Sequence, residues 1–254
     1  MENIKEKTLV IMQPTYIPWL GYFDLIRQAD YFVFYDDVQF VRQSWQSRNK
    51  IKSPQGELYL SVPVKKTTHH DDLLIKDVMI DNNQNWSKKH LKSIVQNYKK
   101  AAFFEEYSGL IESIYSQQFD KLADLNIYLI ELVAKSLNIN TKFIRSSELN
   151  IHKGQKEEGI IDIANHLELN HYLSPKGAFD YLNNEKAENA FNEHDIKVSF
   201  QEFIPQEYPQ LKEPFIPYLG VFDALLNIGA EATLGNIKES SLDNRSYEGM
   251  RGVR

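Results

Sequence analysis

The chain of 254 residues contains no cysteine. Disulfide bonds and thiolate chemistry are therefore excluded, and cysteine usage gives no indication of the redox compartment. Long apolar runs are lacking as well, because the N-terminal stretch MENIKEKTLVIMQP contains only the short run Leu9–Met12. That run is too short for the core of a signal peptide or for a membrane span, so we expect a soluble, cytoplasmic protein.

Positive charge and the common nucleotide, metal and nucleophile motifs are also scarce. Lys and Arg number 29 against 35 Asp and Glu, which gives a formal net charge of −6. This balance argues against a general nucleic-acid binder, although a local basic groove stays compatible with it. The chain has no Walker loop, no GxGxxG, no HExxH and no GxSxG. We therefore predict no metal site, and the cofactor stays undefined.

The strongest pattern that is present runs from Leu9 to Asn49. An apolar, partly β-branched run ends at Met12, and a helical spacing of apolar residues begins at Leu20. A second strand, 31–35, is stopped by two aspartates. Two strands joined through one helix form a βαβ unit, whose ligands lie beyond the carboxyl ends of the strands. The candidate site residues at those ends are Gln13, Tyr16, Trp19, Asp36, Asp37 and Gln39.

The remaining chain continues the alternation of strands and helices. Strands are predicted at 58–64, 74–80, 142–144, 171–173 and 196–200, and helices at 85–137, 155–169 and from 178 onward. The pattern predicts an α/β fold with a mainly parallel, doubly wound, Rossmann-like sheet in a single domain over 1–254. We expect residues 85–138 to be a helical insertion in that domain and 237–254 to be a flexible tail.

Two further loops combine residue types that suit binding. The predicted turn 44–50 brings together the stacking surface of Trp45, the planar cation of Arg48, the amide of Asn49 and the ammonium of Lys50. Such a set suits a phosphate, a carboxylate or a nucleotide, whereas each residue alone fits a basic surface loop. The second loop, with Ser174 and Gly177 between a strand and a helix, suits either a phosphate or an ordinary turn.

A short internal similarity links two distant segments. Ile17–Asp24 (IPWLGYFD) resembles 216–223 (IPYLGVFD), and each opens an apolar helix. The spacing does not recur, which excludes a solenoid. The similarity is either coincidental or marks two equivalent loop-to-helix junctions, the second of which would bring Asp223 and Asn227 to the same cleft.

The block MQPTYIPWLGYFDLIRQADYFVFYDDVQFVRQSWQSRNKI resembles the opening signature of the WbqC-like family. Later segments agree with it: Asn85-Trp86, the turn from Tyr172 through Gly177 with Tyr181-Leu182, Tyr208-Pro209-Gln210 and the helix with Asp223 and Asn227. Pro175-Lys176 and a C-terminal extension depart from it. The resemblance implies a role in bacterial surface-polysaccharide (O-antigen, lipopolysaccharide) synthesis and glycine, aminoacyl or acyl transfer to an amino sugar.

A more distant resemblance, to nucleotidyltransferases and pantothenate synthetase, concerns the fold. In those enzymes a HxGH motif opens the first helix and its histidines bind a triphosphate, whereas this chain has Trp19-Leu20-Gly21-Tyr22 there. The resemblance therefore carries the nucleotidyltransferase-like fold, and ATP activation does not follow from it.

The first hypothesis is a transferase that forms an amide on a nucleotide-linked amino sugar, with an activated acyl or aminoacyl donor as the second small-molecule partner. Its catalytic residues would be Asp36 or Asp37 on the amine and Arg48 and Asn49 on a phosphate or the acyl oxygen. An ATP-dependent ligase or nucleotidyltransferase is the second hypothesis. The third is a non-catalytic binding module, which a sealed, apolar cleft around Trp19 would favour. The sequence leaves the oligomeric state open.

Overall fold

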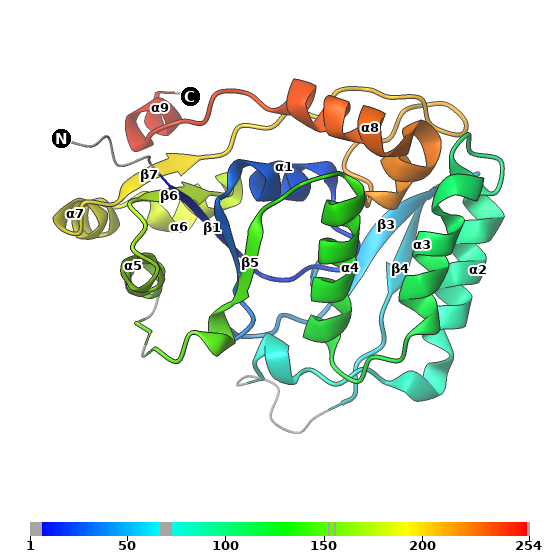
Figure 1. The fold of residues 1–254 in the computed structure, drawn as a ribbon, viewed down its shortest axis with the longest axis horizontal. Coiled ribbons are helices and arrows are strands. Elements are labelled where there is room, and N and C mark those ends of the chain that lie inside the picture. The colour runs from blue at the N-terminus through cyan, green and yellow to red at the C-terminus, as the bar shows by residue number, and fades with distance from the viewer. Residues whose placement is uncertain (1–6, 67–72, 152, 155, 253–254) are drawn as a thin grey trace.

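The computed structural model describes residues 7–66, 73–151, 153–154 and 156–252. Its centre is a five-stranded sheet in which every paired strand is parallel, with the order β5-β2-β1-β6-β7 (Figure 1). The strands are β1 (Thr8–Met12), β2 (Tyr31–Phe34), β5 (Lys142–Arg145), β6 (His171–Ser174) and β7 (Lys197–Phe200). The predicted α/β fold with a parallel sheet is confirmed.

Both faces of the sheet are covered at its centre, which explains why β1 and β2 are apolar almost throughout. Alternate side chains point to opposite faces. Val10 and Phe32 join one buried cluster with α1 (Leu20–Gln28), α4 (Leu122–Ser136) and α8 (Phe222–Ser240). Leu9 and Val33 join the other cluster, with α5 (Glu157–His166) and α7 (Glu185–Glu193).

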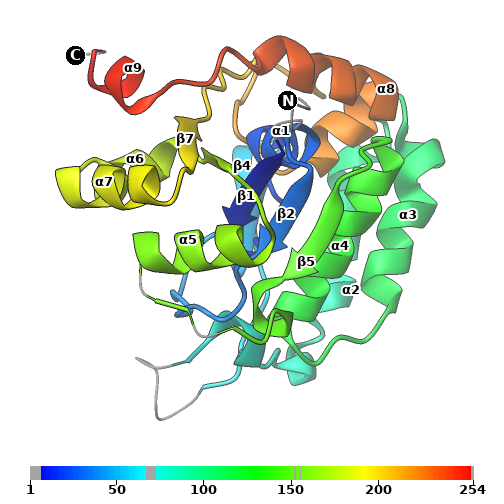
Figure 2. The same cartoon turned by 60° about the vertical axis from the view of Figure 1, so that its left-hand side comes forward.

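Three successive α-helices precede β5. They are α2 (Trp86–Tyr98), α3 (Phe104–Ser116) and α4, and they lie on the opposite side of the sheet from α5, α6 (Phe179–Leu182) and α7 (Figures 1 and 2). Each presents apolar residues at helical spacing, as Ile94 and Tyr98 do on α2.

The structure corrects two predicted elements between β2 and α2. Residues 74–80 form no strand: they contain the 3-10 helix η1 (Ile75–Asp77) flanked by isolated bridges. The predicted turn 44–50 gives way at Arg48 to β3 (Arg48–Ser53), which pairs with β4 (Gly56–Ser61) in a separate antiparallel hairpin. β3 is mostly polar, so its strand character comes from this pairing rather than from an apolar run.

The C-terminal segment expected to be a flexible tail packs on the sheet in its described part. Residues 237–240 are the last turn of α8, and α9 (Tyr247–Arg251) follows. Arg245 exchanges backbone hydrogen bonds with Phe200 of β7, and the Tyr247 side chain is buried. Backbone hydrogen bonds anchor this polar segment, and its packing could not be predicted because its sequence has no apolar periodicity.

The order of the strands determines where a ligand is expected. The chain proceeds from β1 to β2 and β5 on one side, then returns to place β6 and β7 on the other side of β1. In open parallel sheets such a reversal leaves a crevice beyond the carboxyl ends of the two strands that flank it. Here these are β1, which ends at Met12, and β6, which ends at Ser174 and continues into the 3-10 helix η4 (Lys176–Ala178).

Candidate functional site

Two adjoining cavities lie at this reversal and share Met12, Trp19, Tyr22 and Tyr218 as walls; together we call them the switch-point cleft. The first has a volume of about 330 Å³ and is also lined by Thr15, Trp45, Asn49 and Lys50. The second has a volume of about 240 Å³ and is also lined by Gly21, Leu25, Pro175, Lys176, Gly177, Gln201 and Phe203. Predicted residues Trp19, Trp45, Asn49, Lys50 and Gly177 therefore line one cleft.

Trp19 lines both cavities. Its indole lies over Gly21, where a Cβ atom would come within 2.2 Å of the ring, so only glycine fits beneath it. The Trp19 ring meets Phe203 edge-on at 5.2 Å and Tyr218 in a tilted contact, also at 5.2 Å. These contacts hold a broad aromatic surface in the cleft.

The internal similarity of the sequence corresponds to a contact between its two segments. Trp19 and Gly220 form an antiparallel bridge, and the Val221 amide donates to the Pro18 carbonyl at 2.8 Å. A Cβ atom on Gly220 would lie 2.8 Å from the Ile17 carbonyl oxygen, so glycine permits this close approach. The second junction therefore reaches the cleft through Tyr218, which occupies the position equivalent to Trp19.

Polar groups are few in the cleft and are placed at its edges. The Thr15 hydroxyl is buried and has no hydrogen-bond partner among the residues that the structure describes. The Lys50 ammonium pairs with Glu57 at 2.7 Å and lies 5.8 Å from the centre of the Trp45 ring. Lys176 on the far side pairs at 2.8 Å with the buried carboxylate of Glu202. The cleft thus presents rings in the middle and an ammonium at either end.

Two predicted site residues hold the loop after β1 in place. Tyr16 is fully buried, and its hydroxyl lies 2.8 Å from His90 Nδ1 and 2.6 Å from the Tyr115 hydroxyl. The Asn49 amide donates to the carbonyls of Tyr16 and Ile17, at 3.1 and 2.7 Å. These contacts give Tyr16 and Asn49 a structural role, and Asn49 reaches the cleft only as part of its wall.

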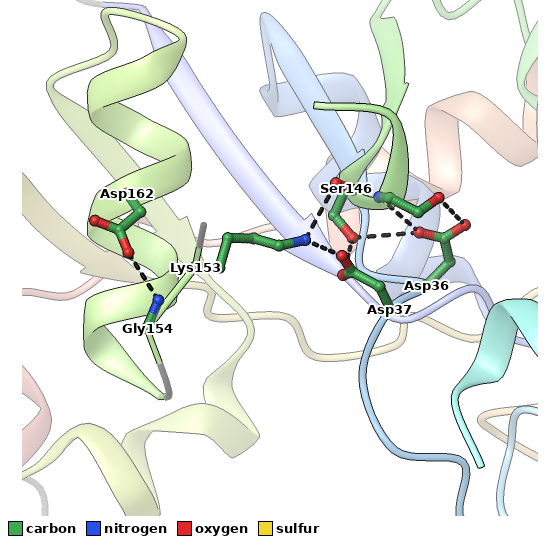
Figure 3. Close-up of polar contacts among 7 residues, drawn as sticks. Asp36, Asp37, Ser146, Lys153, Gly154 and Asp162 are labelled. Carbon is green, nitrogen blue, oxygen red and sulfur yellow. Dashed lines mark hydrogen bonds and ion pairs between the residues drawn. The ribbon is translucent and has the colours of Figure 1, made fainter. Parts of the chain in front are cut away.

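The two aspartates after β2 point to a different place, shown in Figure 3. Asp36 is fully buried and accepts from the Ser146 hydroxyl and from the amide and hydroxyl of Ser147, at 3.2, 3.0 and 2.9 Å. Asp37 accepts from the Ser146 hydroxyl and forms an ion pair with Lys153. Neither carboxylate is among the residues that line the switch-point cleft. They join the end of β2 to the segment after β5.

The loop that follows is secured to the same cluster. Lys153 also lies 5.6 Å from the Tyr35 ring centre, and the next amide, of Gly154, donates to Asp162 of α5 at 2.8 Å (Figure 3). Burial, followed by the charge of Asp37, raises the pKa of Tyr35 to about 12. The phenol is therefore neutral at physiological pH, which is consistent with a structural clasp.

Asp223 and Asn227 lie beneath the loop that precedes α8. Asp223 accepts from the hydroxyls of Tyr98 and Tyr208 and from the Gln210 amide, at 2.7, 2.8 and 2.8 Å. Burial raises the pKa of Asp223, and the two hydroxyl donors oppose that rise. Asn227 accepts from the Leu211 amide and donates to the Asp223 carbonyl. The predicted contact with the cleft is thus made by the loop that these residues support.

The other predicted residues are dispersed around the sheet edge. Gln13 accepts from the Gln46 amide at 2.7 Å next to the cleft, and Ser174 is fully buried. Gln39 bridges to Leu74, and Tyr181 on α6 is 51% exposed. Neither of the last two lines the cleft. Arg48 lies on the outer face of the β3–β4 hairpin, over the ring of Tyr59.

Sequence reasoning missed Thr15, Lys176 and Tyr218 as cleft residues. Tyr218 had a usable signal, because the internal similarity places it opposite Trp19. In the described parts of the chain no group of His, Cys, Asp and Glu side chains is arranged to hold a metal ion. Among the helices of these parts, none is both long and apolar enough to cross a membrane.

The sequence assigns the chain to a known family. Residues 13–234 match the family model described as the WbqC-like protein family, and the chain therefore belongs to that family. It is 34% identical over 229 residues to the protein named "Uncharacterized protein Rv1507c" from Mycobacterium tuberculosis (strain ATCC 25618 / H37Rv), an alignment that covers 89% of this chain and 96% of the relative. No solved structure gives a significant match.

Proposed function

We propose that the protein is a transferase that forms an amide on a nucleotide-linked amino sugar during surface-polysaccharide synthesis, with an activated acyl or aminoacyl donor. The observation that carries this proposal is the switch-point cleft, which consists of two adjoining cavities that share Trp19 as a lining residue. A reaction that joins an acceptor to a donor needs two such neighbouring spaces. Membership of the WbqC-like family supports the proposal, because the resemblance to that family implies a role in surface-polysaccharide synthesis.

The chemistry of the cleft suits a sugar and an acyl group. The faces of Trp19 and Tyr218 are apolar surfaces on which a sugar ring can pack, and the unpartnered Thr15 hydroxyl is available to a sugar oxygen. Lys50 is placed to hold a phosphate or to polarise an acyl oxygen, where a cation stabilises the negative charge that develops as the amine attacks.

The roles of the aspartates change with their location. We expected Asp36 or Asp37 to act on the amine, but both carboxylates are bonded to the segment after β5 and neither lines the cleft. An activated thioester or ester needs alignment with the amine more than it needs a strong base, and alignment is worth about 7–11 kcal/mol. We therefore assign the rate enhancement to positioning in the cleft together with Lys50.

The alternative functions are less well supported by the cleft. A sealed, fully apolar cleft around Trp19 would favour a binding module. This cleft is lined by the polar residues Thr15 and Lys50 and by the half-exposed rings of Trp45 and Tyr218. An ATP-dependent ligase needs groups for a triphosphate. The Tyr22 hydroxyl, at the position of a nucleotidyltransferase histidine, donates instead to the Gln13 carbonyl at 3.0 Å.

The test is an assay of the purified protein with a nucleotide-linked amino sugar and three kinds of donor: acyl or aminoacyl thioesters, aminoacyl-RNA, and ATP with a free amino acid. We expect an N-acylated product by mass spectrometry, and a large loss of kcat/KM in Lys50→Met and Thr15→Val. Lys142→Met is the matched control, because Lys142 also lies over a tyrosine ring but at the opposite end of the sheet.

Absence of product with every donor would refute the transferase assignment. Equal activity of Lys50→Met and wild type would refute the role of the cleft. Pyrophosphate–ATP exchange that depends on the amino acid would instead support the ligase.

A further inference from the structure

The β3–β4 hairpin carries an outer face that the proposed reaction has not used. Asn49, Ile51 and Leu60 point to the buried face of the hairpin, whereas Glu57, Tyr59 and Ser61 are exposed on the outer face. Lys52 at the far end of the outer face is buried, because it donates to Gln210 and to the Lys212 and Pro214 carbonyls. Register places Lys50 opposite Tyr59, with Arg48 one step along the same face of β3. The face is continuous with the cleft, because Lys50 and Trp45 line its first cavity.

Two exposed aromatic rings lie on this face or beside it: that of Tyr59 on β4 and that of Trp45, which precedes β3. Tyr59 is 47% exposed and Trp45 is 50% exposed. Each has a cation beside its ring: the Arg48 guanidinium lies 5.2 Å from the Tyr59 ring centre and the Lys50 ammonium 5.8 Å from that of Trp45. A planar base can stack on such rings, while the adjacent cations bind phosphate.

The two cations of the outer face, Arg48 and Lys50, differ in whether a carboxylate pairs with them. Lys50 is paired with Glu57, whereas no ion pair with a carboxylate is present for Arg48 in the part of the chain that the structure describes. A guanidinium presents several planar donors that match the oxygens of a phosphate, and it is the better of the two for bidentate binding. In a chain of net charge −6, an unpaired Arg48 beside Lys50 is a local positive site.

We propose that the outer face of the β3–β4 hairpin binds a nucleotide, with its base on Tyr59 or Trp45 and its phosphates on Arg48 and Lys50. Glu57 opposes the bound phosphates and sets the strength of binding. This inference deepens the proposed function, on which the assignment of the nucleotide to a substrate rests. The nucleotide then belongs either to the amino-sugar acceptor or to the donor, and its substituent extends into the cleft beside Trp19.

The test is equilibrium binding of nucleotides to the full chain, measured by calorimetry and by quenching of tryptophan fluorescence. The probes are uridine and thymidine diphosphates for the acceptor, and adenosine diphosphate and coenzyme A for the donor. We expect one pair to bind, and to bind more weakly as salt rises, because salt screens the attraction between the phosphates and the two cations. Arg48→Ala should weaken binding at least about tenfold, since a hydrogen-bonded charge is lost.

Further variants separate charge from fold. Arg48→Lys should bind with intermediate affinity, Tyr59→Ala should weaken binding, and Glu57→Gln should strengthen it, because it removes a repulsive charge and releases Lys50. Lys142→Met alters the cation–ring pair at the other end of the sheet and should bind as wild type.

Failure of all four probes to bind at millimolar concentration would overturn the proposal, and so would affinities unaffected by Arg48→Ala and Tyr59→Ala. The binding assay does not require turnover, so its result is distinct from that of the transfer assay. Nucleotide binding that depends on Arg48 without any amide product would refute the transferase and leave this face as a nucleotide site. Amide formation without such binding would support the transferase and refute the nucleotide site on this face.

Discussion

The buried histidine His90 should make the stability of this protein fall on mild acidification. His90 lies on α2 and is 7% exposed, with Nδ1 at 2.8 Å from the Tyr16 hydroxyl that anchors the loop of the cleft. Burial lowers the pKa of His90 from 6.5 to about 4, and the backbone carbonyl of Ser61 opposes part of that fall. The neutral imidazole is thus the form that fits the folded chain.

The sign and size follow from proton linkage. Between pH 6.5 and about 4 the unfolded chain binds a proton at this histidine and the folded chain does not, so the free energy of unfolding falls as the pH falls. The full difference corresponds to about 3 kcal/mol, of which about 2 kcal/mol is lost between pH 7.5 and pH 5. A loss of that size is a substantial fraction of the stability of an ordinary domain.

The measurement is urea unfolding at a series of pH values between 7.5 and 5, for wild type and for His90→Asn, whose amide can still contact the Tyr16 hydroxyl. We expect the variant to be less stable at pH 7.5 and to lack about 2 kcal/mol of the acid-induced loss. His166→Asn is the matched control, because His166 is exposed at the end of α5. Equal dependence on pH in wild type and His90→Asn would refute the reasoning.

Two further changes test the supports of the site. Asn49→Ala leaves two buried carbonyls after β1 without their amide donor, so we expect a loss of about 2 kcal/mol in the free energy of unfolding, measured by denaturant titration, and an unchanged melting point would contradict it. Lys153→Met leaves the carboxylate of Asp37 partly buried without its cation, which should cost about 3 kcal/mol; Lys153→Arg should retain most of the stability, and equal losses in the two variants would exclude the ion pair as the cause.

The parts of the fold that could be predicted are those in which burial alone determines the pattern. β1 and β2 are covered on both faces and are therefore apolar runs, and α1 between them shows helical spacing. β3 could not be predicted in this way, since RNKIKS has few apolar residues and becomes a strand by pairing with β4. The apolar residues around Ile75 predicted a strand. The segment pairs with its neighbours only through isolated β-bridges and forms no continuous ladder.

The residues of the candidate site also fall into those that could be predicted from the sequence and those that could not. Trp19 could be placed at the edge of the sheet because it lies in the loop that follows β1. Lys50 was predicted in a binding turn, and it lines the cleft from β3 instead. The aspartates could not be assigned, because the partners of Asp36 lie 110 and 111 residues later in the chain. The structural role of Tyr16 could not be predicted either, because the groups that hydrogen-bond to its hydroxyl come from α2 and α3. Long-range partners decide which polar residues are available to a ligand.

The bridge between Trp19 and Gly220 has a consequence for the biogenesis of the protein. One wall of the cleft comes from the first tenth of the chain and the facing ring, Tyr218, from the last fifth. During synthesis the β1–α1–β2 unit emerges early, but the cleft is completed only when the segment around Gly220 docks upon it. Until this docking the cleft lacks the Tyr218 wall, and any ligand that binds there would hold the two segments together and stabilise the folded protein by mass action.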